Sequence, residues 1–248
     1  DLHSFPTRRS SDLQLVFRNQ SEQDIEASIA EMAAAIDQSQ MIMIPGGFSA
    51  GDQPDGSGKF IAAVFRNPAM ADAVMNLLKK RDGLMLGICN GFQALIKLGL
   101  LPDGEIKALA PDMPTLTYNT IGRHISAIPM TKVVSNLSPW LAQAEIGKSY
   151  RIPVSHGEGR FVASDEAIAR LIAGGQIATQ YVDFEGHATM DGAFNLNGSV
   201  CAIEGITSAD GRILGKMGHS ERVGAGLYKN IPGDKDQKIF ESGVAYFK

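Results

Sequence analysis

The sequence predicts an α/β fold, with a mostly parallel sheet flanked by helices. Two short, continuously apolar runs, 41–44 and 83–88, have the composition of strands that are buried on both faces. Segments with a helical period alternate with these runs, which gives the strand, helix, strand, helix order of a doubly wound sheet. Beyond Pro102 extended patterns dominate, so we expect an added mixed or antiparallel portion.

The first part of the chain divides at residue 13. Residues 1–12 are polar and show neither a helical nor a strand period, so they are interpreted as a disordered or foreign leader. Residues 13–248 are interpreted as one domain. A short apolar run at 13–17 is expected to be structured. Ser21 is a plausible cap for the helix that follows, because it begins a capping-box pattern with Asp24 in place of Glu.

The remaining elements follow from local signals. Asn67-Pro68 is a cap and first residue for a helix, and Ser164 caps another that Gly174-Gly175 ends. The expected helices are 22–36, 68–80, 91–98, 165–173 and about 235–246, and the extended segments after Pro102 are 121–134, 150–154, 176–181, 200–207 and 212–217.

The composition limits the possible functions. The 248 residues are 44% hydrophobic and 20% charged, which fits one globular domain. A net charge of −4 argues against binding to nucleic acid or an anionic membrane, so small molecules or other proteins are the expected partners. No apolar run approaches the roughly 20 residues that span a bilayer. Two dispersed cysteines argue against a disulfide framework, which favours a cytoplasmic location.

A strand-to-helix turn carries the candidate nucleophile. In Gly87-Ile88-Cys89-Asn90-Gly91, glycines stand two residues to either side of a cysteine, which is the pattern of a nucleophile elbow. A helix beginning near Asn90 would favour the thiolate and offer N–H groups to an oxyanion, with the Gly46-Gly47 loop as a second donor. The alternative is that Cys89 is only a small buried side chain. Cys201, in an apolar run, is expected to be structural.

A cysteine nucleophile needs a proton acceptor. In His219-Ser220-Glu221 an extended backbone would project the imidazole and the carboxylate to the same side, so that Glu221 could fix the tautomer of His219. His156, in a glycine-punctuated loop, is an alternative base. His124 and His187 have no organising pattern, and His3 belongs to the leader. No phosphate-binding glycine motif and no metal-ligand spacing occurs, so no nucleotide or metal site is predicted in this chain.

Four motifs together resemble a known family. The chain from residue 13 onward is similar to the glutaminase part of the phosphoribosylformylglycinamidine synthases, which are class I glutamine amidotransferases with a flavodoxin-like fold. The segments that carry the resemblance are Pro45-Gly46-Gly47-Phe48-Ser49-Ala50-Gly51-Asp52, Gly87-Ile88-Cys89-Asn90-Gly91-Phe92-Gln93, Ser155-His156-Gly157-Glu158-Gly159, and Gly205-Ile206-Thr207-Ser208 leading to Met217-Gly218-His219-Ser220-Glu221-Arg222.

The resemblance implies a mechanism and a set of roles. Cys89 would attack the amide of glutamine, with His219 and Glu221 completing the triad, and the ammonia would serve ATP-dependent conversion of formylglycinamide ribonucleotide in de novo purine synthesis. The chain itself would need no cofactor, whereas ATP and Mg²⁺ would belong to a partner synthetase domain or subunit. The implied oxyanion donors are Gly47 and Asn90, and the implied substrate-binding residues are Gly46, Phe48, Gln93, Ser155, His156 and Gly157.

The sequence also departs from the family. Gly218 and Ser220 replace prolines that often flank the histidine, with a small expected effect on the chemistry. An opening strand and helix that such domains have are missing before residue 13, which suggests a fragment of a longer, fused synthase with foreign sequence at its front. Two other functions stay open: a glutaminase for another synthetase, and an inactive glutamine-binding or docking domain.

Overall fold

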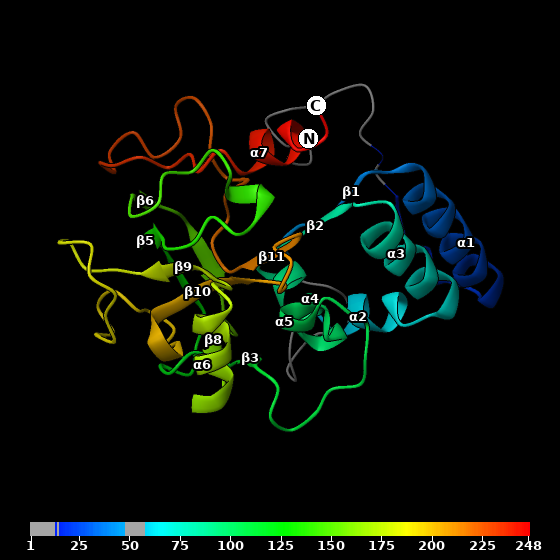
Figure 1. The fold of residues 1–248 in the computed structure, drawn as a ribbon, viewed down its shortest axis with the longest axis horizontal. Coiled ribbons are helices and arrows are strands. Elements are labelled where there is room, and N and C mark those ends of the chain that lie inside the picture. The colour runs from blue at the N-terminus through cyan, green and yellow to red at the C-terminus, as the bar shows by residue number, and fades with distance from the viewer. Residues whose placement is uncertain (1–12, 14, 48–57) are drawn as a thin grey trace.

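A seven-stranded mixed sheet runs through the computed structural model, which describes residues 13, 15–47 and 58–248 (Figure 1). The first three strands in space pair in parallel and all later neighbours pair antiparallel, so the polarity of pairing changes at the third strand. The predicted α/β class with an added mixed portion is confirmed. The spatial order is β1 (Met41–Ile44), β2 (Leu84–Ile88), β11 (Ile213–Lys216), β10 (Ile203–Thr207), β9 (Ile177–Tyr181), β5 (Met130–Val133) and β6 (Ser149–Arg151).

Two short antiparallel ribbons lie beside the main sheet. In one, β3 (Thr115–Thr117) pairs with β8 (Arg160–Val162), and in the other, β4 (Ile125–Ala127) pairs with β7 (Val154–His156). The two ribbons therefore hold both ends of the loop that connects β7 to β8.

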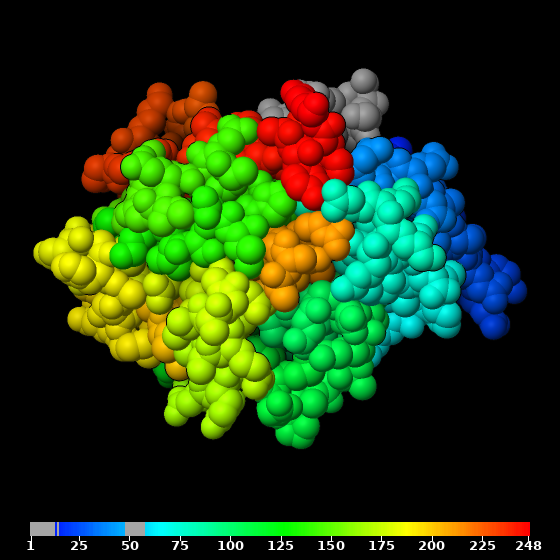
Figure 2. All heavy atoms as spheres, in the orientation of Figure 1, coloured from blue at the N-terminus to red at the C-terminus, as the bar shows by residue number. Residues whose placement is uncertain are grey.

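The helices pack against the sheet and against one another. The helix α1 (Glu22–Gln38) packs on α3 (Pro68–Lys80) at one end of the molecule, and the loop from 181 to 199 forms the opposite end (Figure 2). The helix α4 (Asn90–Leu98) packs on β2 and β11. The other helical segments are α2 (Lys59–Phe65), α5 (Leu100–Asp103), α6 (Asp165–Ala173), α7 (Ile239–Ala245) and the 3-10 turns Pro139–Leu141 and Val200–Ala202.

Three predicted helix starts are confirmed by their caps. The side chain of Ser21 accepts a hydrogen bond from the backbone N–H of Asp24, and Ser164 caps α6 in the same way. Asn67 caps α3, and Pro68 occupies its first turn.

Several expected elements differ in the structure. Residues 15–20 form no strand; the side chain of Val16 is 80% exposed, whereas Phe17 packs edge-on against Phe60 of α2, a helix that the sequence pattern did not predict. The last helix begins at Ile239 rather than near 235, because Lys238 adopts a left-handed conformation and its N–H bonds to the side chain of Asp236.

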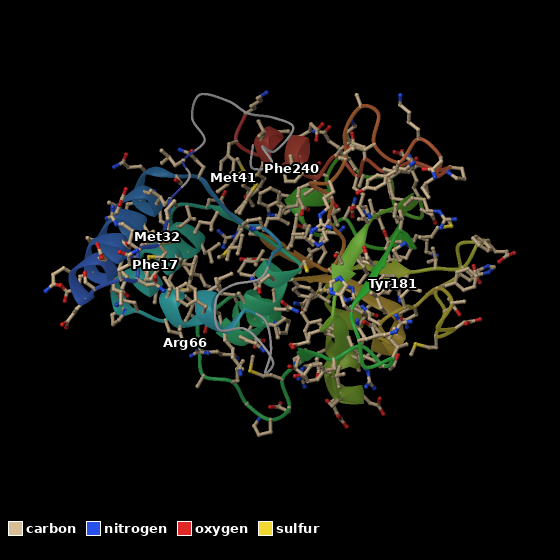
Figure 3. All side chains as sticks on the ribbon, turned by 180° about the vertical axis from the view of Figure 1, so that it is seen from behind. Phe17, Met32, Met41, Arg66, Tyr181 and Phe240 are labelled. Atoms are coloured by element: carbon tan, nitrogen blue, oxygen red, sulfur yellow. The ribbon has the colours of Figure 1, made fainter. Side chains whose placement is uncertain are left out.

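The core lies between the sheet and its helices. Trp140 and Phe92 are fully buried, and Tyr181 is 1% exposed in the antiparallel half of the sheet, at the far side from Met32 of α1 (Figure 3). No helix among the described residues is long and apolar enough to cross a bilayer. The predicted leader, 1–12, lies outside the described residues.

Candidate active site

Cys89 lies on the turn between β2 and α4, as the elbow pattern predicts. Its backbone angles are φ 52° and ψ −104°, a left-handed conformation that is strained for a residue with a side chain. Its N–H donates to the carbonyl of Lys216 at the end of β11, at 2.8 Å. Backbone pairing with the neighbouring strand therefore holds the nucleophile in a conformation that it would not adopt alone.

The two flanking glycines permit this turn. A β-carbon at Gly91 would lie 2.1 Å from the carbonyl oxygen of Ile44, and one at Gly87 would lie 2.6 Å from Leu95 and 2.7 Å from the backbone of Gly91. Both positions are too crowded for any other residue. The physical reason for the Gly-x-Cys-x-Gly spacing is thus close packing of α4 on β1 and β2.

The resting Cys89 is a neutral thiol. Burial raises the pKa of Cys89 to about 12, and the backbone N–H of Asn90 only partly opposes this effect. We expected the start of the helix to favour the thiolate, but desolvation is the larger effect in the structure. Ionisation of Cys89 therefore requires a partner that takes the proton.

His219 and Glu221 form the pair that the sequence predicts. Nδ1 of His219 lies 2.5 Å from Oε1 of Glu221, and the imidazole is 1% exposed. The segment is a turn rather than an extended strand, closed by the Arg222 N–H on the carbonyl of His219. The carboxylate accepts the N–H of Nδ1, so the lone pair of the neutral ring lies on Nε2. No described residue hydrogen-bonds to Nε2.

Gly46 brings the cysteine and the histidine into one site. A β-carbon on Gly46 would lie 2.4 Å from Cε1 of His219 and 3.2 Å from Cβ of Cys89. The imidazole and the cysteine side chain therefore both lie beside this glycine, with no room for a larger residue. The carboxyl ends of β1, β2 and β11 thus supply the glycine, the nucleophile and the base.

The loop after β7 forms another wall of the site. Sγ of Cys89 lies 3.7 Å from the carbonyl oxygen of Ser155, whose hydroxyl lies 3.1 Å from Nε2 of His124. The buried side chain of Gln93 donates from its amide nitrogen to the carbonyl of Glu158 at 2.5 Å. Gln93 therefore links α4 to this loop, and its predicted contact with glutamine stays a prediction.

Asn119 organises the same loop. Its amide nitrogen donates to the carbonyls of His156 and Arg123, and its Oδ1 accepts from Gly159 N–H and faces Nδ1 of His156 at 3.1 Å. Burial lowers the pKa of His156 to about 4, with His219 and His124 adding to the effect. A neutral His156 with Nδ1–H on Asn119 is thus built into the wall, and Nε2 has no partner among the described residues.

The other predicted residues are placed as follows. Gly47 has φ 149°, a backbone conformation that favours glycine, and Gly157 precedes the glutamate that Gln93 holds. Phe48 lies outside the described residues. Cys201, expected within a buried strand, is instead exposed on a 3-10 turn with φ 51°. The oxyanion and substrate roles stay predictions.

Sequence reasoning missed the polar residues that support the site. Asn119 stands in a segment without a recognisable motif. Glu204 and Lys216 were hidden in apolar strands, although a charge inside each of two otherwise apolar runs was a signal that a buried pair should form. A buried thiol in the same site as an imidazole that a carboxylate orients is an arrangement suited to acyl transfer through a covalent thioester.

Comparison with known proteins identifies the class. Residues 13–247 match the family described as the CobB/CobQ-like glutamine amidotransferase domain, and the chain belongs to this family. The resemblance found in the sequence is confirmed by relatives that carry a more specific name.

Curated relatives are named phosphoribosylformylglycinamidine synthase subunit PurQ. That of Chlorobaculum parvum is 35% identical over 207 residues, which cover 83% of this chain and 73% of the relative. That of Salinibacter ruber is 36% identical over 210 residues, covering 84% and 80%. The solved structure of PurLQS from Thermotoga maritima superposes with a TM-score of 0.62 at 30% identity, covering 86% of this chain and 82% of that one.

Proposed function

We propose that this chain hydrolyses glutamine to glutamate and ammonia through a thioester on Cys89. The observation that carries the proposal is that Cys89 and His219 both lie beside Gly46, with Glu221 on Nδ1 of the imidazole. The family membership and the names of the relatives support it.

The first half-reaction forms the thioester. Nε2 of His219 takes the proton of the Cys89 thiol as sulfur attacks the side-chain amide carbon of glutamine. The resulting oxyanion would accept hydrogen bonds from the backbone N–H groups of Gly47 and Asn90. His219 then gives its proton to the departing nitrogen, the carbon–nitrogen bond breaks, and ammonia leaves.

The second half-reaction releases glutamate. His219 removes a proton from water, the hydroxide attacks the thioester carbon, and the carbon–sulfur bond breaks. The thiolate recovers the proton from the imidazolium. The raised pKa of Cys89 makes this reset favourable, because the buried site prefers the neutral thiol.

The ammonia would pass to a synthetase domain or subunit, which would use ATP and Mg²⁺ to convert formylglycinamide ribonucleotide to its amidine in the cytoplasm. This assignment is supported by relatives named as a subunit of that synthase. The glutamine itself would be bound by Gly46, Phe48 and Gln93, together with the loop residues Ser155, His156 and Gly157.

The test is covalent trapping with a diazoketone analogue of glutamine, read by intact mass and peptide mapping. We expect one equivalent on Cys89, blocked by excess glutamine, and none in Cys89→Ser. The exposed Cys201 is removed by Cys201→Ser in both samples, so that any label reports the elbow. Glutamine binding without labelling of a folded chain would contradict the proposal and favour an inactive docking domain.

A further inference from the structure

The turn that carries His219 lies over a buried ion pair that the reaction above does not use. Lys216 ends β11, and Glu204 lies on the adjacent strand β10. Both side chains are fully buried, and Nζ of Lys216 lies 3.6 Å from Oε1 of Glu204. Because such a pair loses its hydration on folding, burial makes it weak evidence for stability. Its hydrogen bonds point instead to a role at the site.

The pair holds both polar backbone groups of the residue before the base. Oε1 of Glu204 accepts the N–H of Gly218 at 2.5 Å, and Nζ of Lys216 donates to the carbonyl of Gly218 at 3.2 Å. A β-carbon at Gly218 would lie 2.6 Å from Ile152 and 2.8 Å from Glu204, so the glycine allows the two charges to approach the backbone.

The same ammonium group reaches the residue after the base. Nζ of Lys216 donates to Oγ of Ser220 at 2.9 Å and to Oε1 of Gln237 at 3.0 Å. The hydroxyl of Ser220 donates in turn to Gln237 at 2.8 Å. One cation therefore binds the chain on both sides of His219, while Thr179 donates to the other oxygen of Glu204.

Lys216 also contacts the nucleophile through its backbone. Its carbonyl accepts the N–H of Cys89 at 2.8 Å, and this bond holds the strained turn. The positions of Cys89 and of the turn bearing His219 are thus both fixed relative to Lys216. Burial lowers the pKa of Lys216, whereas Glu204 and Glu221 oppose that effect.

We propose that Lys216 and Glu204 are positioning residues that set the alignment of His219 with Cys89. This inference rests on the proposed glutaminase function. Neither residue needs to touch glutamine, because each acts through Gly218 and Ser220. Loss of the pair should slow formation of the covalent bond and leave binding of the glutamine analogue unchanged.

The experiment compares the inactivation rate constant kinact and the binding constant KI of the diazoketone analogue in matched variants. The double variant Lys216→Met with Glu204→Met removes both charges together, which avoids leaving one buried and unpaired. Leu171→Ala, in α6, is the control for lost stability, because it truncates a core side chain that makes none of the network's hydrogen bonds. Ser220→Ala removes a single hydroxyl of the network.

We expect kinact of the double variant to fall at least about tenfold with KI within about twofold, whereas Leu171→Ala keeps both constants despite a lower Tm. Ser220→Ala should fold normally and lose roughly threefold in kinact. A folded double variant with wild-type kinact would overturn the inference. If the double variant does not fold, Ser220→Ala decides: unchanged kinact overturns the inference. Failure of the wild-type chain to label would instead contradict the proposed function.

Discussion

The nucleophile and the base are placed by different kinds of interaction. Cys89 is held by backbone sterics, since two glycines let α4 pack against β1 and β2 and a backbone hydrogen bond fixes the turn. The turn of His219 is held by side-chain charges and hydroxyls beneath it. Parallel strands carry the first arrangement, and the switch to antiparallel pairing at β11 carries the second. The position of the nucleophile therefore depends on glycines, whereas the position of the base depends on a buried polar network.

The largest expected effect is at Gly46, where the two regions meet. In Gly46→Ala the new β-carbon would lie 2.4 Å from the imidazole of His219, so the ring must leave its present position beside Cys89. We expect kinact to fall by about a thousandfold, which corresponds to about 4 kcal/mol, with a small change in Tm. The labelling assay measures this loss. Labelling at the wild-type rate would show that the base does not lie beside Gly46.

The steric arrangement is tested at Gly91. In Gly91→Ala the β-carbon would overlap the carbonyl oxygen of Ile44 on β1, a backbone atom that cannot move without the strand. We expect a loss of about 3 kcal/mol in the free energy of unfolding, measured by urea denaturation. Gly157→Ala is the matched control, because no described atom lies within 4 Å of its new methyl group. Equal stability of the two variants would contradict the role given to Gly91.

The polar side of the site should make the free energy of unfolding depend on pH, because His156 is buried in it. Its folded pKa is lowered from 6.5 to about 4 by burial, so the unfolded chain binds the proton more readily. This contribution to stability is present above pH 6.5 and is lost as the pH falls toward 4. Between pH 7 and pH 5 we expect a loss of roughly 2 kcal/mol.

The measurement is urea unfolding of wild type and His156→Gln at a series of pH values. The variant should lack this part of the pH dependence, whatever its stability at pH 7. Parallel curves for the two proteins would show that His156 is not the group responsible.

The smallest expected effect is the difference between the alkylation rates of the two cysteines in the absence of glutamine. Because Cys89 is buried and its pKa is raised to about 12, a small neutral alkylating agent should modify the exposed Cys201 first near pH 8. We expect a difference of about tenfold in rate, read by peptide mapping over time. Faster modification of Cys89 would mean that its resting state is the thiolate.

The sequence predicted the steric half of the site better than the polar half. The glycine spacing around Cys89 and the apolar runs of β1 and β2 are local signals, and the structure confirms the turn that they predict. Ser21, Asn67 and Ser164 likewise marked helix starts, because capping involves residues two or three apart.

The polar supports could not be predicted because they are non-local. Asn119 meets His156 only when β4 pairs with β7, and Glu204 meets Lys216 only when β10 pairs with β11. At 13–17 the sequence instead indicated regular structure that is not observed. The composition of this run is apolar, but residues 15–17 belong to no helix or strand, because an apolar run without a paired neighbour cannot form a sheet.

The connection between the two halves of the site has a practical consequence. Cys89 precedes the exposed segment 105–112, and His219 follows it, so neither part of the chain holds both reacting groups. A single cleavage in this segment would separate the nucleophile from the base, so neither piece alone would hold the complete pair. Fast labelling of Cys89 by the analogue should therefore require the two pieces to stay associated.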